Sequence, residues 1–352
     1  MPRSYYRRKN RTDNPHPRGP VYGAIDLGTN SCRLLLAEPT DTGFQVVDGF
    51  SQIVRLGEGM SKSGRLSDSA MERTLVALKK CAKKAKDLNA IKIRCIATEA
   101  CRRAENGMAF LTRIKQQTGL SFEIVTPEME AELTLSGCVP LLKTGHKKAL
   151  IFDIGGGSTE IMWIDTPYGH PPHINEILSF PMGVVTLVED YGTDINRDDL
   201  NARVRARITK QLEPFSQHHH IQSAMRNGDV QIIGTSGTAT TLGAIYLGLQ
   251  RYDRARVDGL TIPFENIHAI AAKLTRMDNE SRRQIPCIGT ERADLMLMGC
   301  AILTAICTHW PTKNLRAADR GIREGILMGM IDQDHGHTPT VTNLGDAVAT
   351  SG

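Results

Sequence analysis

Residues 24–38 read AIDLGTNSCRLLLAE, and residues 149–164 read ALIFDIGGGSTEIMWI. Each stretch has an apolar run that ends in Asp-x-Gly, a turn of small residues, and a second apolar run. Apolar runs of this length, bounded by turn residues, are typical of buried strands. The first stretch predicts strands at 21–28 and 32–37 that form a hairpin, and the second predicts another strand, glycine-rich turn and strand.

The two stretches form an internal repeat. When Asp26 is aligned with Asp153, at an offset of 127 residues, D-L-G-T-N-S lies over D-I-G-G-G-S. Each copy has an apolar strand before it and another after it. The repeat predicts two related α/β halves, each of which opens with a strand–loop–strand hairpin. Two such loops facing each other would form a cleft between domains.

The rest of the chain alternates between strand and helix patterns, which indicates an α/β fold. Ser69 and Glu72 form a candidate capping box at the start of the first long helix. Further strands are expected at 45–56, 91–98, 121–125 and 230–233. Helices are expected at 69–88, 107–118, 128–142, around 196–213, from about 238, near 293–309 and at 321–331.

Composition limits the class of protein. A chain of 352 residues suggests two domains of ordinary size. No apolar run approaches the roughly 18 residues of a membrane span, and no apolar stretch follows the basic start, so we expect a cytoplasmic protein without a secretory signal. The eight cysteines include no C-x-x-C pair, and we interpret them as reduced core residues instead of a zinc site.

The net charge of +5 comes from the first 20 residues, which hold six Lys or Arg and one Asp. The remaining 37 basic and 37 acidic residues balance, so a bound polyanion would need a local basic groove. We interpret residues 1–20 as an inert disordered tail, in preference to a segment that contacts nucleic acid or extends a polyanion track. No specific nucleic-acid partner is expected.

The repeated loop has the residues of a phosphate site. Glycines let the backbone approach an anion and adopt positive φ, and successive N–H groups can form an anion-binding nest. Asn30, Ser31, Ser158 and Thr159 add side-chain donors. Because Asp26 and Asp153 would repel phosphate, they make sense as holders of a divalent cation, Mg²⁺ through water, or as residues that orient a water.

The competing interpretation is a pair of glycine hairpins that only turn the chain, with Asp as a turn former. Two copies in equivalent strand contexts argue against it. A third glycine-rich turn, IIGTSGTATTLGAI at 232–245, follows a strand and opens a helix, which is again the arrangement of an anion or nucleotide loop. The triplet His218–His220 could bind a metal, but it follows Pro214 in a polar stretch, and we interpret it as a solvated loop.

Taken together, these motifs resemble the actin, sugar-kinase and heat-shock-chaperone ATPase superfamily. Within it, the chain is more similar to the exopolyphosphatase/guanosine pentaphosphate phosphohydrolase (Ppx/GppA) family, over about residues 21–330. Eight blocks carry this resemblance in order: AIDLGTNSCRLLLAE (24–38), ATEACRRAENG (97–107), EIVTPEMEAEL (123–133), IFDIGGGSTEI (151–161), SFPMGVVTLVE (179–189), GTSGTATTL (234–242), ERADLMLMGCAIL (291–303) and DRGIREGIL (319–327).

There are two departures from the family pattern. Only Glu130 of the segment Glu128-Met129-Glu130-Ala131 sits directly before the alanine, where the family often has two adjacent glutamates. Ser236 stands where glycine is common, which weakens the case for a base-binding pocket. The length of the chain corresponds to the short, two-domain form of the family.

The resemblance implies two ribonuclease-H-like (actin-like ATPase) domains with mixed sheets flanked by helices and a cleft between them. Domain I would be 21–134, completed by a helix at 319–332, and domain II would be 135–318, with a flexible tail at 333–352. Family habit suggests a homodimer.

The resemblance also implies roles for individual residues. Glu130 would be the base for the attacking water or would only orient it, and Mg²⁺ would be held by Asp26 and Asp153 with Glu160 as helper. Arg33 could bind phosphate or be structural, and Arg292 and Arg323 match family positions but could pair with nearby acids. The expected phosphate-binding residues are Gly28, Thr29, Asn30, Ser31, Arg33, Arg102, Gly155, Gly156, Gly157, Ser158, Thr159, Gly234 and Gly237.

The leading functional hypothesis is therefore an exopolyphosphatase that releases terminal orthophosphate from polyphosphate. A guanosine pentaphosphate 5′-phosphohydrolase is the close alternative, because the resemblance covers both. A kinase or chaperone ATPase of the superfamily is disfavoured by the Glu130 block. A non-catalytic phosphate sensor is disfavoured by the presence of Asp26, Glu130 and Asp153 together.

Overall fold

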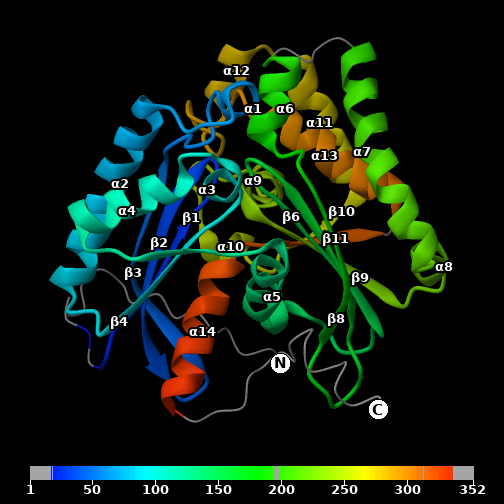
Figure 1. Cartoon of the computed structure of the whole chain (residues 1–352). Helices are drawn as coiled ribbons and strands as arrows, with labels where there is room; N and C mark the ends of the chain where they lie inside the picture. Colours follow the sequence, from blue (N-terminus) through cyan, green and yellow to red (C-terminus); the bar gives the residue numbers. More distant parts are fainter. Residues whose placement is uncertain (1–16, 18, 194–197, 312, 336–352) are drawn as a thin grey trace. The chain divides into compact units, whose positions relative to one another are not determined.

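The computed structural model describes residues 17, 19–193, 198–311 and 313–335 (Figure 1). These residues divide into two compact units. The first contains the chain up to Pro140 together with the segment from Gly321, and the second contains Leu141–Arg320. A boundary at residue 134 would cut helix α5 (Pro127–Cys138), so the division falls after that helix has ended. Most of the two expected tails lies outside the described residues.

The first unit contains a mixed five-stranded sheet. The hairpin expected at Asp26 is confirmed, because β1 and β2 pair antiparallel, and β3 pairs antiparallel with β2. β4 and β5 extend the sheet on the other side of β1 in parallel. The order across the sheet is β3 (Gly43–Ile53), β2 (Ser31–Thr40), β1 (Tyr22–Leu27), β4 (Lys92–Ala97) and β5 (Phe122–Ile124).

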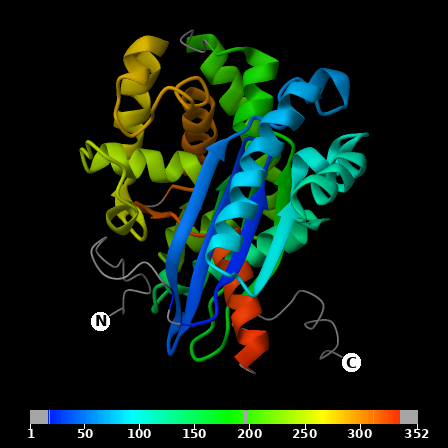
Figure 2. The same cartoon turned by 90° about the vertical axis from the view of Figure 1, so that its left-hand side faces the viewer.

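Helices cover both faces of this sheet, which explains why its central strands are apolar on both sides. On β1, Ile25 and Leu27 belong to the core under α2 and α4, whereas Tyr22 and Ala24 belong to the core under α14. Figure 2 shows α2 lying across the first of these faces. The helices of this unit are α1 (Met60–Ser63), α2 (Asp68–Asp87), α3 (Glu99–Arg103), α4 (Gly107–Thr118), α5 and α14 (Ile322–His335), and a 3₁₀ turn at Val139–Leu141 follows α5.

The start of α2 differs from the expected one. The N-cap is Ser67, whose Oγ accepts a hydrogen bond from the Ala70 N–H at 3.3 Å. Ser69 lies inside the first turn, so the capping box predicted at Ser69 and Glu72 is wrong. Ser67 and Ser69 both fit the sequence pattern of an N-cap. The position of the first helical hydrogen bond decides which of them caps the helix.

Helices α5 and α14 pack closely through glycines. A Cβ atom on Gly325 of α14 would overlap the Leu133 carbonyl of α5, and one on Gly137 would overlap the Gly321 carbonyl. The segment from Gly321 therefore belongs to the first unit through backbone-to-backbone contact with α5. The helix expected at 319–332 begins at Ile322 and continues to His335.

The second unit repeats the strand order of the first and adds one edge strand. β6 and β7 form the second expected hairpin, β8 pairs antiparallel with β7, and β9 and β11 follow β6 in parallel. The order is β10 (Thr261–Pro263), β11 (Asn314–Ala318), β9 (Val230–Thr235), β6 (Lys148–Ile154), β7 (Thr159–Asp165) and β8 (His173–Phe180). The internal repeat seen in the sequence is thus a repeat of topology.

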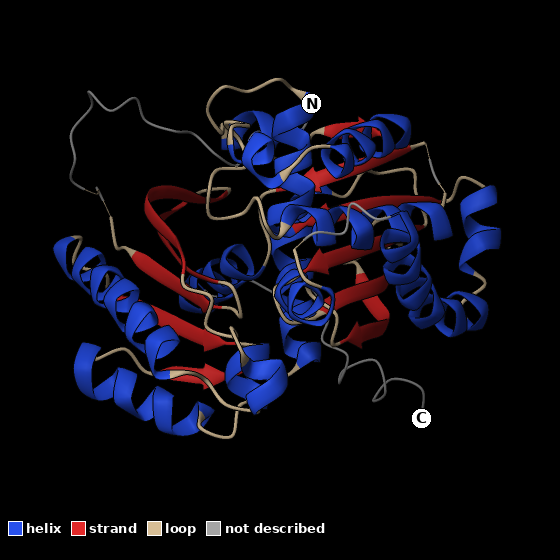
Figure 3. Ribbon diagram, turned by 90° about the horizontal axis from the view of Figure 1, so that it is seen from above, coloured by secondary structure: helices blue, strands red, loops and turns tan. Residues whose placement is uncertain are grey.

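The helices of the second unit lie beside its sheet (Figure 3), and most of them share one core with Leu150, Phe152 and Ile154 of β6. They are α6 (Val184–Tyr191), α7 (Asp198–His218), α8 (Ile221–Arg226), α9 (Ser236–Tyr246), α10 (Arg254–Val257), α11 (Phe264–Arg276), α12 (Asn279–Arg283) and α13 (Met296–His309). Helix α13 is buried along most of its length, in accord with its uniformly apolar sequence.

The end of α7 corrects a further prediction. Pro214 lies inside the helix, which continues to His218. His219 is mostly buried against the Phe215 ring, with ring centroids 4.9 Å apart. The solvated loop expected at His218–His220 is therefore corrected in two ways. His218 belongs to the helix, although its side chain is exposed as predicted, and His219 follows the helix but is mostly buried.

The eight cysteines are free and buried, as expected for reduced core residues. None of the helices that the structure describes is long and apolar enough to cross a membrane.

Candidate active site

The first phosphate loop is held by the segment that follows β3. The Gly28 N–H donates to the Ser31 carbonyl at 3.0 Å and closes the hairpin turn. The Asn30 carbonyl accepts from the N–H groups of Val54 and Arg55 at 2.9 and 3.0 Å. These bonds fix the backbone of the loop, while Ser31 itself is buried.

The second loop repeats this geometry. The Gly155 N–H donates to the Ser158 carbonyl at 3.0 Å, which is the bond of the first loop displaced by 127 residues. The Gly156 carbonyl accepts from the Val185 N–H at 2.8 Å, at the start of α6. Gly183, the N-cap of α6, has no room for a Cβ, which would overlap the Gly156 carbonyl and lie 2.6 Å from the Gly157 nitrogen.

Space, and not positive φ, explains two of the loop glycines. Gly28, Gly155–Gly157, Gly234 and Gly237 all lie outside the left-handed region, so the predicted use of positive φ is wrong. A Cβ on Gly155 would come within 3.0 Å of the Ser158 carbonyl, and one on Gly234 would come 2.6 Å from the Phe152 ring. Glycine at these two positions therefore permits close packing of the loops.

Ser236 carries the backbone strain that glycine would avoid. Its φ is 75°, in the left-handed region that side chains disfavour. Its Oγ donates to the Ile154 carbonyl at 2.6 Å, one residue before the second phosphate loop. The third glycine-rich turn is thus tied to the second by a side chain that the family pattern often lacks.

Asp26 lies at the end of β1, opposite Arg33 on β2. Burial raises the pKa of Asp26, the charges of Arg33 and Arg323 lower it, and Glu324 raises it further. The pKa of Asp26 therefore lies above its ordinary value, because the effect of desolvation is larger than that of the two arginine charges. Arg33 and Arg323 are therefore placed to neutralise this carboxylate, which supports the structural alternative for both.

Arg102 and Glu130 meet at the carboxyl ends of the parallel strands of the first sheet. Arg102 lies on α3, which follows β4, and Glu130 lies in the first turn of α5, which follows β5. The Arg102 Nη1 atom is 3.4 Å from Glu130 Oε2 and donates to the Val125 carbonyl at 2.6 Å. Ligands of α/β proteins bind at this edge of a parallel sheet.

The two acidic residues of the second unit that are predicted to hold a metal, Asp153 and Glu160, lie on the two strands of its hairpin. Asp153 is paired in register with Glu160, and Glu160 is buried and accepts from Ser179 Oγ at 3.0 Å. Thr159 is fully buried and its hydroxyl donates to the Met182 carbonyl at 2.8 Å. The Thr159 side chain thus joins the loop to the segment that enters α6.

The third loop and the end of β11 lie at the same edge of the second sheet. Thr235 is paired with Asp153 on one side and with Ala318 on the other. The Thr235 hydroxyl donates to the Arg320 carbonyl at 2.9 Å, and the Arg320 guanidinium makes a buried ion pair with Asp258. A Cβ on Gly237 would meet no atom within 4 Å, so space does not require glycine there.

Three residues of the site were not predicted from the sequence. Glu99 binds Arg102, Gly183 supports the second loop, and Glu324 is buried, acts on Asp26 and accepts from the Gly321 N–H at 2.9 Å. Each lies in one of the eight blocks that resemble the family. The available signal was therefore their presence in those blocks. Glu99 also lies three residues before Arg102, a spacing at which ion pairs form within a helix, whereas Gly183 and Glu324 act on Gly156 and Asp26, which are distant in sequence.

The donor set of the two loops fits a hard divalent cation. Asp26 and Asp153 offer carboxylate oxygens, which Mg²⁺ prefers. The Asn30 Oδ1 atom is buried and has no hydrogen-bond partner among the residues that the structure describes. A buried oxygen of this kind in the loop that follows Asp26 is chemically suited to a metal or to its bound water.

Comparison with known proteins agrees with this architecture. A model of the Ppx/GppA phosphatase family matches residues 35–334. The crystal structure of the Aquifex aeolicus member of the Ppx/GppA family is 26% identical with a TM-score of 0.70, and the match covers 91% of this chain and 99% of that one.

Two further structures are similar. An exopolyphosphatase-like protein is 27% identical with a TM-score of 0.77, over 90% of this chain and 98% of that one. An exopolyphosphatase from Cytophaga hutchinsonii, at 22% identity, has a TM-score of 0.79 over 92% of this chain and 100% of that one, and shows the likeness of fold. Two mixed sheets flanked by helices are the actin-like arrangement of these structures, and with the family match over most of its length the chain belongs to the Ppx/GppA phosphatase family.

Proposed function

We propose that this protein is an exopolyphosphatase, which releases orthophosphate from the end of inorganic polyphosphate. The observation that carries the proposal is the pairing of Arg102 with Glu130 at the carboxyl edge of the first sheet. A carboxylate that orients water and a fork of N–H donors for phosphate oxygens are the two groups that hydrolysis of a phosphoanhydride needs from side chains.

In the proposed reaction, Glu130 holds a water and accepts its proton while the water oxygen attacks the terminal phosphorus. The bond from that phosphorus to the bridging oxygen breaks, and the products are orthophosphate and a chain shorter by one phosphate. Arg102 binds oxygens of the substrate and offsets their charge. When bound, Mg²⁺ would neutralise charge on the transferred phosphoryl group, and Asp26 and Asp153, with Glu160 as helper, would hold it.

Each phosphate loop contributes donors of its own. Apart from the N–H groups of Gly28 and Gly155, which close the turns, the backbone N–H groups and Asn30 act in the first unit, and Gly156, Gly157 and Ser158 act in the second. We propose that each loop binds phosphate, since the repeat has kept the same closing hydrogen bond in each. A family member of 27% identity named exopolyphosphatase-like supports polyphosphate as the substrate.

The test is phosphate release from long polyphosphate, short polyphosphate and guanosine pentaphosphate, side by side, with Mg²⁺ and with EDTA. We expect release from polyphosphate that needs Mg²⁺ and stops in EDTA. Release from guanosine pentaphosphate alone would replace the proposal with the nucleotide phosphohydrolase. ADP formation that depends on an added alcohol or acid acceptor would indicate a kinase, and tight binding without turnover would indicate a sensor.

A further inference from the structure

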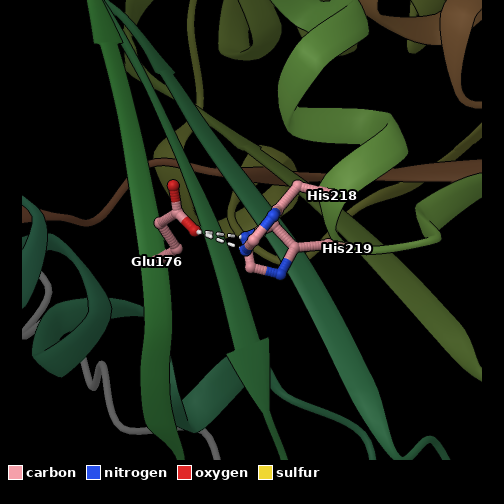
Figure 4. Close-up of side chains that lie close together, drawn as sticks. All are labelled: Glu176, His218 and His219. Atoms are coloured by element: carbon pink, nitrogen blue, oxygen red, sulfur yellow. Dashed lines mark hydrogen bonds and ion pairs between the residues drawn. The ribbon is translucent and has the colours of Figure 1, made fainter.

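Three side chains that commonly bind metals meet on the second unit, on elements that carry none of the predicted phosphate loops. They are Glu176 on β8, His218 at the end of α7, and His219 directly after it (Figure 4). One ligand atom of each lies within 4.8 Å of the other two. No other group of this kind occurs among residues 17, 19–193, 198–311 and 313–335.

A β-bulge aims Glu176 at the histidines. β7 and β8 pair Trp163 with Glu176 and then Ile164 with Ile174, so Asn175 is an extra residue in β8. Asn175 and Glu176 are consequently both exposed, which breaks the alternation of a regular strand. Bulges commonly redirect a side chain next to functional sites.

The last turn of α7 supplies the two histidines. The His219 N–H donates to the Phe215 carbonyl at 3.2 Å, and His220, with φ of 51°, then turns the chain away. The His219 ring packs on Phe215 and lies 6.5 Å from the Trp163 ring, between centroids. Only 14% of the His219 side chain is exposed, against 73% for His218, so one ligand is held by packing and the other opens to solvent.

The distances suit a metal after small movements. His219 Nε2 is 2.6 Å from Glu176 Oε2, and His218 Nε2 is 3.8 Å from the same oxygen. Ligands at about 2.0–2.1 Å from a tetrahedral ion lie about 3.3 Å from each other. One of the two distances in the cluster is shorter than this value and the other is longer. A metal would replace the proton of the hydrogen bond between His219 and Glu176.

We propose that Glu176, His218 and His219 bind a divalent transition-metal ion of the zinc class, with solvent as the remaining ligand. Two imidazoles and one carboxylate favour zinc, nickel or copper over Mg²⁺, which prefers oxygen ligands. The ion joins the end of α7 to β8, which are distant in sequence. Its role is structural, because the apolar rings of Phe215 and Trp163 fix His219 and no predicted catalytic residue takes part.

The experiment uses the full chain without an affinity tag and measures Zn²⁺ binding by competition with a chromogenic chelator. The variants are His218→Ala and Glu176→Gln, both at exposed positions. The matched control is His220→Asn, which alters the same triplet and tolerates the left-handed φ. Each protein is also tested with Asp26→Asn and Asp153→Asn added, so that metal bound at the phosphate loops is not counted.

We expect one Zn²⁺ per chain, with affinity lower by roughly ten- to a hundredfold in His218→Ala and in Glu176→Gln and unchanged in His220→Asn. Co²⁺ bound by the unaltered chain should give visible absorption that both variants lose. Equal Zn²⁺ affinity in all four proteins would show that the cluster is only a hydrogen-bonded ion pair. Mg²⁺ binding at this cluster as tight as Zn²⁺ binding would also overturn the proposal.

Discussion

Arg102 donates from Nη2 to the Oε2 atom of Glu99 over 2.6 Å, three residues apart on the short helix α3. The side chains are 19% and 11% exposed, so solvent screens this ion pair weakly. This bond holds the guanidinium in place without any substrate. The other terminal nitrogen of the guanidinium, Nη1, lies 3.4 Å from the Oε2 atom of Glu130. We therefore propose that Glu99 is a positioning residue that acts through Arg102.

Removing the charge of Glu99 tests this relationship. In Glu99→Gln the guanidinium loses an ionic partner and can move, so we expect kcat/KM for polyphosphate to fall roughly 10- to 100-fold. Glu99→Asp should recover part of the loss because it restores the charge. The control is Glu105→Gln, which breaks the exposed pair with Arg65 and should leave kcat/KM unchanged. Full activity in Glu99→Gln would exclude the positioning role.

Glu130→Gln should remove the base and keep the fold. Its amide cannot accept the proton of water, so we expect kcat to fall roughly 10²- to 10⁴-fold while polyphosphate still binds. Phosphate release and a direct binding assay measure the two quantities. Glu123→Gln, which breaks the partly exposed pair with Arg94, is the matched control. Near-normal turnover in Glu130→Gln would assign the base to another residue.

Gly183→Ala should displace the second phosphate loop. The added methyl overlaps the Gly156 carbonyl, so either α6 or the loop must move, at a cost of about 1–3 kcal/mol in stability. We expect kcat/KM to fall as well, because Gly156 and Gly157 are proposed phosphate donors. Val185→Ala is the comparison. It removes buried side-chain volume two residues after Gly183 and adds no atom that would overlap the loop. If both variants keep full activity, the exact placement of this loop does not matter for the reaction.

Two glycines of α14 should respond to alanine in opposite directions. In Gly325→Ala the new methyl meets the Leu133 carbonyl, so α14 and α5 must separate and we expect a loss of about 1–3 kcal/mol. In Gly329→Ala the methyl meets no atom within 4 Å, and the better helix propensity should add up to about 1 kcal/mol. Urea denaturation of both variants measures the difference. A stabilised Gly325→Ala protein would contradict the close packing of these helices.

Stability should fall in alkaline solution because of buried thiols. Burial raises the pKa of Cys95, Cys101 and Cys300 to about 12, whereas an unfolded cysteine titrates near about 8.5. As pH rises, these thiols lose their protons in the unfolded chain before they do so in the folded protein. Their contribution to stability is therefore fully present below about pH 8.5 and is lost as pH rises towards about 12. Each thiol contributes a slope of about 1.4 kcal/mol per pH unit in that window.

The measurement is urea denaturation between about pH 8 and about pH 10.5 with a reductant present. Cys101→Ala should show a shallower fall than the unaltered chain, by the share of one thiol. Equal slopes would mean that Cys101 ionises in the folded protein as it does in the unfolded one.

Much of the architecture could be read from the sequence. The two hairpins follow from apolar runs that end at Asp26 and Asp153, since strand formation and a tight loop depend on neighbouring residues. The repeat at an offset of 127 predicted that one topology occurs twice, and the strand orders of the two sheets confirm it. Long helices such as α2 and α13 were likewise visible as apolar periods.

Other features depended on contacts between distant parts of the chain. The sequence placed the cap of α2 at Ser69 instead of Ser67, and it placed a loop where α7 continues to His218. In both places neighbouring residues fit the same local pattern, and tertiary packing selected one of them. Positive φ was expected at the loop glycines and occurs instead at Ser236, since close approach to Ser158 and Phe152 is what those glycines allow.

The sequence by itself determined the two glycine loops, the acid at the end of each leading strand and the α/β class, because these are set within about ten residues of chain. Only the tertiary structure decided that Arg102 lies beside Glu130, that Gly183 supports Gly156, and that a bulge turns Glu176 towards His219. The physical reason is that a side chain's partner is chosen by the packing of whole elements, which no local pattern of residues encodes.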